Sequence, residues 1–283
     1  MATEVKARPV YSNLEQGRID VDRLTPRQTD ILALARQHGR VDVDGLAVHF
    51  NVTPQTIRKD LNELCDRRLL NRMHGGATYP SGVANYGYEA RRMLAADGKR
   101  RIGLKAADLI PDHASIVINI GTTTEQVAMA LRRHEGIMVV TNNINAANIL
   151  REVQSAEVVI AGGLVRHADG GVVGEAAVDF IRQFRVDYAV IGTSAIDVDG
   201  TLLDFDLREV KVAQAIIETA RETILVADAM KLARRAPVRI GHLEQIDVFV
   251  TDELPPPEIA RICEQYEVRI EVASGQELEQ SVA

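Results

Sequence analysis

The chain has 283 residues, of which 46% are hydrophobic and 26% charged, and its formal net charge is −7. This length suits two domains rather than one, and no apolar run reaches the ~18 residues that a membrane span requires. Residues 1–22 lack the apolar core of a secretion signal, and two cysteines, Cys65 and Cys263, are too few for a framework of several disulfides. We therefore expect a cytoplasmic protein without a membrane partner.

Charge is distributed unevenly along the chain. Residues 1–80 contain 12 Lys and Arg against 10 Asp and Glu, a net charge of +2, which leaves −9 for the remainder. A positively charged N-terminal part is compatible with a nucleic-acid partner. Because the excess is so small, an expectation of nucleic-acid binding must rest on the sequence pattern. Residues 1–22 have no periodicity and are expected to form a flexible tail.

Two short helices are expected after this tail. Thr25 can cap a helix and Pro26 suits its first position, and the pattern ends at Gly39. The apolar stripe of this helix consists of Ile31, Leu32, Leu34 and Ala35. A second helix is expected from Asp42 as its cap, and its inward residues are Leu46, Ala47 and Phe50.

A third helix, from Pro54 to about Asp66, has the clearest pattern. Thr53 is its expected cap, and Ile57, Leu61 and Leu64 bury one face. The outward residues are Gln55, Thr56, Arg58, Lys59 and Asn62. Their amide, hydroxyl and cationic groups suit base edges and phosphates in a major groove, as on the second helix of a helix-turn-helix. A solvated face of an ordinary helix is the alternative for this segment alone.

A hairpin is expected directly after the third helix. Residues 69–73 and 77–79 are expected to be its strands, with a turn at His74, Gly75 and Gly76. Arg72 and His74 would then meet DNA phosphates or a minor groove. The sequence therefore predicts a winged helix-turn-helix domain over residues 24–79.

Residues 52–61 (VTPQTIRKDL) and 72–77 (RMHGGA) resemble the signature of the DeoR family of bacterial repressors. The resemblance implies that the helix beginning after Thr53 enters the major groove. It also implies that Thr56, Arg58 and Lys59 contact DNA.

An α/β domain is expected over residues 99–275, after a linker at 80–98 that contains Pro80, Gly82, Gly87 and Gly98. A helix is expected from Arg100. Short apolar strands then alternate with helices, and these strands are expected at 115–120, 137–141, 158–161, 188–192, 223–228, 248–251 and 269–272. This alternation predicts a mostly parallel sheet with ligands at the carboxyl ends of its strands.

Small and polar residues follow several of these strands. Gly121, Thr122, Thr123 and Thr124 open a helix, where free backbone N–H groups could cradle a phosphate. A plain turn with a threonine cap is the alternative. Other strand ends contribute Asn142, Gly162, Gly163, the Gly192, Thr193 and Ser194 run, and Asp228. Asp204 and Glu209 could accept hydrogen bonds from ligand hydroxyls while Lys231 supplies positive charge.

This half also resembles the DeoR sensor domain, through Gly121–Thr123, Thr141 and Asn142, residues 161–163, and Asp228 with Lys231. The resemblance implies a fold related to ribose-5-phosphate isomerase. Residues 169–176, 179–185 and 203–206 most resemble family members that control glycerol catabolism, which implies glycerol 3-phosphate as the effector. Ala195 departs from the family, which commonly has glycine at this position. No cofactor or metal is expected.

The sequence thus predicts a homo-oligomeric repressor, dimer or tetramer, that leaves operator DNA when a phosphorylated effector binds. One alternative is a sugar-phosphate isomerase-like enzyme fused to a DNA-binding domain, because carboxylates in such a fold could abstract a proton. A second alternative is a dinucleotide-sensing repressor. Against it, no G-x-G-x-x-G motif follows any expected strand.

Overall fold

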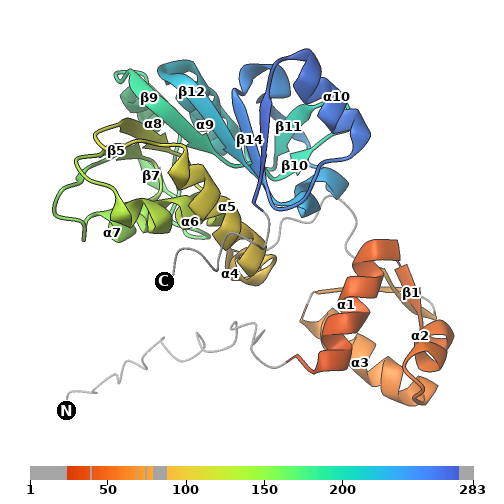
Figure 1. Cartoon of the computed structure of the whole chain (residues 1–283). Helices are drawn as coiled ribbons and strands as arrows, with labels where there is room; N and C mark the ends of the chain where they lie inside the picture. The colour runs from red at the N-terminus through yellow and green to blue at the C-terminus, as the bar shows by residue number, and fades with distance from the viewer. Residues whose placement is uncertain (1–23, 39, 68, 74, 79–87, 274–283) are drawn as a thin grey trace, which may run out of the picture. The chain divides into compact units, whose positions relative to one another are not determined.

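The computed structural model describes residues 24–38, 40–67, 69–73, 75–78 and 88–273 (Figure 1). The chain divides into two compact units with a boundary between Pro80 and Ser81, and each unit is described by itself. The expected tail 1–22, His74 and residues 79–87 lie outside the described residues. Within the described ranges, no helix has the length and apolar character needed to cross a membrane.

The first unit is a three-helix domain with a small sheet. Its elements are α1 (Pro26–His38), β1 (Arg40–Asp42), α2 (Val43–His49), α3 (Pro54–Asp66), β2 (Asn71–Met73) and β3 (Gly76–Thr78). The side chains of Thr25, Asp42 and Thr53 each accept a hydrogen bond from the backbone N–H three residues later, at 3.2, 2.7 and 3.2 Å. These bonds satisfy N–H groups that have no partner inside the helix, which explains why the three helices begin where the sequence predicts.

The core of this unit is continuous through all three helices and the sheet. Ile31, Ile57, Leu64, Leu70 and Ala77 are almost fully buried there. The antiparallel sheet has the order β1-β3-β2. Strand β1 was not expected from the sequence, because three residues with one apolar side chain give no period, and its conformation comes from pairing with β3.

A seven-stranded parallel sheet organises the second unit. Its order is β15-β14-β12-β9-β4-β5-β6. The strands are β4 (Ser115–Ile118), β5 (Met138–Thr141), β6 (Glu157–Ile160), β9 (Val186–Ile191), β12 (Ala220–Val226), β14 (Val248–Thr251) and β15 (Arg269–Val272). All seven expected strands are confirmed, with ends that shift by no more than three residues.

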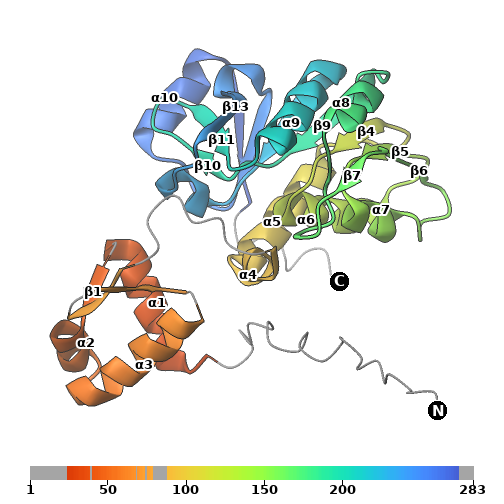
Figure 2. The ribbon, with the colours of Figure 1, turned by 180° about the vertical axis from the view of Figure 1, so that it is seen from behind.

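Helices cover both faces of this sheet (Figures 1 and 2). Along β4, Ile116 and Ile118 belong to one apolar core and Val117 to the other, because successive side chains of a strand point to opposite faces. The first core contains side chains of α5 (Ala96–Asp108), α6 (Thr122–Ala130) and α7 (Ile144–Leu150). The second contains side chains of α8 (Glu175–Ile181), α9 (Leu207–Thr219) and α10 (Pro257–Gln265).

Smaller elements flank the large sheet. Strands β10 (Ala195–Ile196), β11 (Thr201–Asp204) and β13 (Val238–His242) form an antiparallel sheet, and β7 (Leu164–Val165) pairs with β8 (Val172–Val173). The described part of this unit also contains the short 3-10 helices η2 (Leu131–Arg133), η3 (Ala229–Ala233) and η4 (Leu243–Gln245). Strand β11 ends at Asp204 and η3 contains Lys231, so both elements contribute to the site described below.

The expected linker 80–98 differs from the structure. It contains α4 (Tyr88–Met93), and α5 begins at Ala96 rather than at Arg100. Gly98 looked like a helix breaker in the sequence, but it lies inside α5 where a Cβ atom would be 2.3 Å from a carboxylate oxygen of Asp252. This glycine therefore permits a close approach of α5 to Asp252.

Candidate functional site

The outward face of α3 is the first candidate site. Thr53, Gln55, Arg58 and Lys59 are exposed and Thr56 is half-buried, whereas the opposite face packs into the core. The Thr53 and Thr56 hydroxyls lie 2.9 Å apart, next to the N-terminus of the helix. Donors and acceptors at this end of the helix have the arrangement of a recognition helix.

A buried polar cluster fixes α3 against α1. The Asp60 carboxylate is almost fully buried and accepts hydrogen bonds from Arg27 Nε at 2.7 Å and Gln28 Nε2 at 3.3 Å. Gln28 Nε2 also donates to Glu63 at 2.7 Å. Such bonds orient the helix that carries the candidate DNA contacts, and sequence reasoning missed them because the partners are more than thirty residues apart.

The hairpin of β2 and β3 lies beside α3. The exposed Arg72 donates to the Asn62 side chain, and a groove is lined by residues from both α3 and the hairpin, including Arg58, Asn62, Arg72 and Gly75. Two arginines therefore border one groove, where positive charge favours phosphates. His74 lies outside the described residues.

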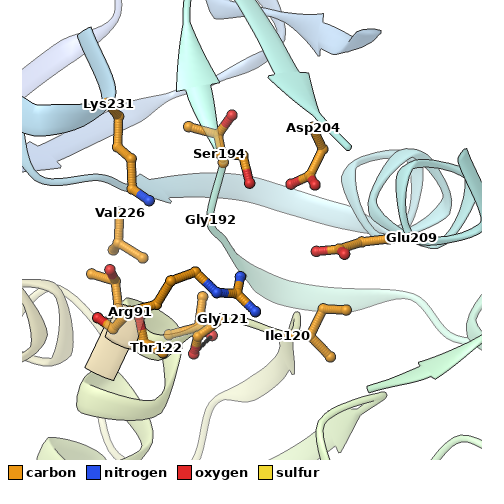
Figure 3. Close-up of a pocket in the computed structure, with 13 residues that line it drawn as sticks. Arg91, Ile120, Gly121, Thr122, Gly192, Ser194, Asp204, Glu209, Val226 and Lys231 are labelled. Atoms are coloured by element: carbon orange, nitrogen blue, oxygen red, sulfur yellow. Dashed lines mark hydrogen bonds between the residues drawn. The ribbon is translucent and has the colours of Figure 1, made fainter. Parts of the chain in front are cut away.

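A pocket at the carboxyl ends of β4, β9 and β12 is the second candidate site (Figure 3). It is lined by Arg91, Ile120, Gly121, Thr122, Thr123, Thr124, Gly192, Thr193, Ser194, Asp204, Glu209, Val226 and Lys231. These three strands are neighbours in the centre of the sheet, so their ends converge as the carboxyl ends of parallel strands do.

One wall of the pocket is the N-terminus of α6. Gly121 has φ +148°, a conformation that strains residues with a side chain, and it turns the chain directly into the helix. The first N–H groups of a helix have no partner within it and favour an anion. The Thr124 hydroxyl donates to the carbonyl groups of Asn119 and Gly121. By contrast, the Thr123 hydroxyl has no hydrogen-bond partner among the described residues.

Two cations extend into the same pocket (Figure 3). Arg91 Nη2 donates to Asp169 at 3.1 Å, but the buried Nε has no hydrogen-bond partner within the described parts of the chain. The Lys231 ammonium likewise has neither a hydrogen bond nor an ion pair to any described residue. Burial is the main reason that the pKa of Lys231 falls to about 8, although Asp228 opposes this effect. Unpaired donors of this kind favour an anionic ligand.

Two carboxyl groups occupy the opposite side of the pocket. Asp204 and Glu209 are both buried, and Arg166 Nη2 lies 2.7 Å from a Glu209 carboxylate oxygen. Burial, followed by the nearby Asp204 carboxylate, raises the pKa of Glu209 to about 8 despite Arg166. A carboxyl group that is protonated near neutral pH can both donate to and accept from a ligand hydroxyl. The pocket thus pairs a cationic end with an end suited to hydroxyl groups.

Most of the expected effector residues lie in this pocket. Its lining includes Gly121, Thr122, Thr123, Thr124, Asp204, Glu209 and Lys231. Asn142, Gly162 and Gly163 are not part of the lining: Asn142 is buried and donates to the Val172 carbonyl at 3.1 Å. Gly162 and Gly163 follow β6, which lies at the edge of the sheet and away from the central strands.

Sequence reasoning missed Arg91 altogether. It belongs to α4, inside the expected linker, and it reaches the pocket only because α4 packs against α6. The sequence gives no distinctive local signal for it, because adjacent arginines such as Arg91 and Arg92 also occur at 100–101 and 132–133. No group of three or more His, Cys, Asp and Glu residues that could hold a metal is present among the described residues.

A winged helix-turn-helix joined to an α/β domain that has a pocket lined by polar and charged side chains defines a class of protein, the ligand-sensing DNA-binding regulators. Comparison with known families identifies the family within this class. Residues 27–83 match the DeoR-like helix-turn-helix domain and residues 94–253 match the DeoR C terminal sensor domain. The chain belongs to the DeoR family.

Individual relatives support the same placement. The chain is 42% identical to the glycerol-3-phosphate regulon repressor of Escherichia coli (strain K12) over 248 residues, which are 88% of this chain and 98% of that protein. It is 47% identical to the protein of the same name from Haemophilus influenzae over 229 residues, 81% of this chain and 89% of that one. These relatives are regulators, and this chain is a regulator rather than the isomerase-like enzyme of the alternative expectation.

Solved structures give a weaker comparison. Ribose 5 phosphate isomerase A from Neisseria gonorrhoeae has a TM-score of 0.36 and 14% sequence identity, and the match covers 48% of this chain and 53% of that one. Similarity at this level carries no argument about function.

Proposed function

We propose that the chain represses transcription by binding operator DNA through α3 and the β2–β3 hairpin, and that glycerol 3-phosphate in the pocket releases it. The family supports DNA binding. The names of the two relatives above support control of a glycerol-3-phosphate regulon. The contacts with DNA would come from Thr53, Gln55, Thr56, Arg58, Lys59, Arg72 and His74.

The observation that carries the effector assignment is the polarity of the pocket. Arg91 and Lys231 present unpaired donors beside the α6 N-terminus, where a phosphate fits. Asp204 and Glu209 face this end and suit the hydroxyls of a small polyol. A phosphorylated polyol satisfies both ends at once, whereas glycerol lacks the anion and inorganic phosphate lacks the hydroxyls.

The repressor is proposed to act in the cytoplasm as a dimer or tetramer, so that two recognition helices read a repeated operator. Effector binding must favour the arrangement that misplaces these helices, because a ligand with equal affinity for both states shifts nothing. A coupling of about 1–3 kcal/mol changes operator affinity roughly 5–150-fold.

Titration of operator DNA with the full-length protein tests this proposal. Glycerol 3-phosphate, glycerol and hexose phosphates are added in turn, and we expect release with glycerol 3-phosphate at the lowest concentration. Release by a different phosphate ester at lower concentration, with no response to glycerol 3-phosphate, would refute the effector assignment.

Two variants separate the sites. Arg58→Ala removes one candidate DNA contact and should weaken operator binding about 5–150-fold while effector affinity stays unchanged. Thr123→Val removes a free hydroxyl from the pocket and should do the reverse. Arg132→Ala is the control, since this exposed arginine on η2 pairs with Glu152 and lies outside both sites. If Arg58→Ala and Arg132→Ala had equal effects on DNA binding, the proposal that α3 binds the operator would be refuted.

A further inference from the structure

Helix α4 lies directly after the boundary between the two units in the chain. It is the first described element of the sensor unit, and its first residue, Tyr88, follows the boundary at Pro80 and Ser81 by a few residues. A helix of six residues has little stability of its own, because helix nucleation is costly. Its place against the sensor therefore depends on the contacts that hold it.

Those contacts come from the effector pocket and its immediate support. The Arg91 carbonyl oxygen, at the C-terminal end of α4, accepts hydrogen bonds from Lys99 Nζ and from the Thr122 hydroxyl, the latter at 3.5 Å. Carbonyl groups in the last turn of a helix have no partner within the helix. Thr122 is itself the first residue of α6, so this one residue both lines the pocket and contacts α4.

A second anchor lies at the other end of α4. The Tyr88 hydroxyl donates to a carboxylate oxygen of Glu125 at 2.8 Å and accepts from Asn145 Nδ2 at 2.9 Å. Glu125 is buried in the first turn of α6, so α4 is tied to this helix at both ends. Neither Tyr88 nor Glu125 lines the pocket.

The Arg91 side chain extends from α4 into the pocket. Its guanidinium lies inside the pocket between the α6 N-terminus and the carboxyl groups (Figure 3). Its buried Nε–H has no hydrogen-bond partner among the described residues, and an unpaired buried donor is unfavourable. An anion at the α6 N-terminus would supply the missing acceptor.

We propose that Arg91 binds the phosphate of the effector and that α4 is the element that transmits occupancy of the pocket to the DNA-binding unit. The proposal rests on the proposed function, because it requires a phosphorylated ligand in this pocket. A bound phosphate pairs with Arg91 and stabilises α4 in its place on α6. In the operator-bound state α4 is detached from α6. The ligand therefore has different affinities for the two states, which is the condition for shifting their populations. The chain connects α4 to the hairpin through residues 79–87.

Hydrogen exchange and operator release of the full-length protein test the proposal together. Saturating glycerol 3-phosphate should slow exchange of the α4 backbone amides, Tyr88–Met93, several-fold in the wild type. It should also slow exchange of the first-turn amides of α6, which report that the ligand is bound.

Tyr88→Phe then separates transmission from binding. It removes one anchor of α4 outside the pocket, so the concentration of glycerol 3-phosphate that releases half of the operator should rise about fivefold. Without ligand, this variant should bind the operator no more weakly than the wild type does. A variant that was merely misfolded would bind the operator more weakly. Arg132→Gln is the control and should match the wild type.

The outcomes distinguish this inference from the proposed function. Protection of α6 and release of the operator, with unchanged α4 exchange and a wild-type response of Tyr88→Phe, would overturn α4 as the transmitter and leave the effector assignment intact. Unchanged exchange in both α4 and α6 would overturn the effector assignment, and the inference with it.

Discussion

Replacement of Lys231 by methionine should have opposite effects on stability and on effector binding. Lys231 is half-buried in the pocket, and no hydrogen bond or ion pair to a described residue compensates its charge. Its pKa of about 8, against 10.5 for an unperturbed lysine, corresponds to roughly 3 kcal/mol against the charged form. Because the side chain keeps partial exposure, solvent screening reduces this cost to about 2 kcal/mol.

Lys231→Met removes that cost and should raise the free energy of unfolding of the sensor by about 1–2 kcal/mol, or its Tm by about 2–8 °C. Effector affinity should fall about 10–150-fold, because a hydrogen bond from a charged donor is lost. Thermal unfolding and calorimetric titration with glycerol 3-phosphate measure the two effects on the same preparation. Such an exchange of stability for affinity is typical of functional sites.

The pH dependence gives an independent check of the same reasoning. Between pH 8 and 10.5 the unfolded chain holds the Lys231 proton and the folded chain does not, so wild-type stability should rise across this range. Lys231→Met should lack this rise.

Lys211→Met is the matched control for this experiment. Lys211 Nζ pairs with Glu175 at 2.6 Å on the surface, outside the pocket, so its loss should give no gain in stability and no change in affinity. A Lys231→Met protein that is less stable than the wild type, or that binds the ligand as tightly, would refute the reasoning.

Two further predictions concern the buried residues of each unit. The raised pKa of Glu209 means that the folded sensor holds a proton that the unfolded chain loses, so wild-type stability should decline as pH rises from about 4.5 to 8. Glu209→Gln should abolish this decline, and urea unfolding at pH 5 and 8 measures it. Ile57→Ala should destabilise the DNA-binding unit by about 2–5 kcal/mol and abolish operator binding with effector affinity retained, whereas Val48→Ala, at an exposed position, should change stability by less than ~0.5 kcal/mol.

Helix α3 was predictable because its signals are local. Thr53 and Pro54 fix its start, and the spacing of Ile57, Leu61 and Leu64 fixes its buried face, so the residues left outside follow directly. The contact of the buried Asp60 carboxylate with the partly exposed Arg27 was not predictable, since no pattern relates a carboxylate on one helix to a guanidinium on another.

The pocket was predictable in part. Each strand end could be recognised in the sequence, but the order of the strands could not, and the order decides which ends meet. Gly121 and Lys231 follow central strands and line the pocket, whereas Gly162 follows the edge strand β6 and does not. Arg91 illustrates the same limit, because its place depends on the packing of α4 against α6.

The sequence by itself determined the two-unit organisation, the starts of α1, α2 and α3, the seven strands of the large sheet and the glycine turn before α6. These features depend on interactions within a few residues: capping hydrogen bonds, side-chain periodicity and backbone conformation. The tertiary structure alone decided which strand ends converge, how Arg166 and Asp204 act on Glu209, and that α4 contributes a cation to the pocket. These depend on distances between residues far apart in the chain, and burial, which changes the strength of every charge, exists only once the chain has folded.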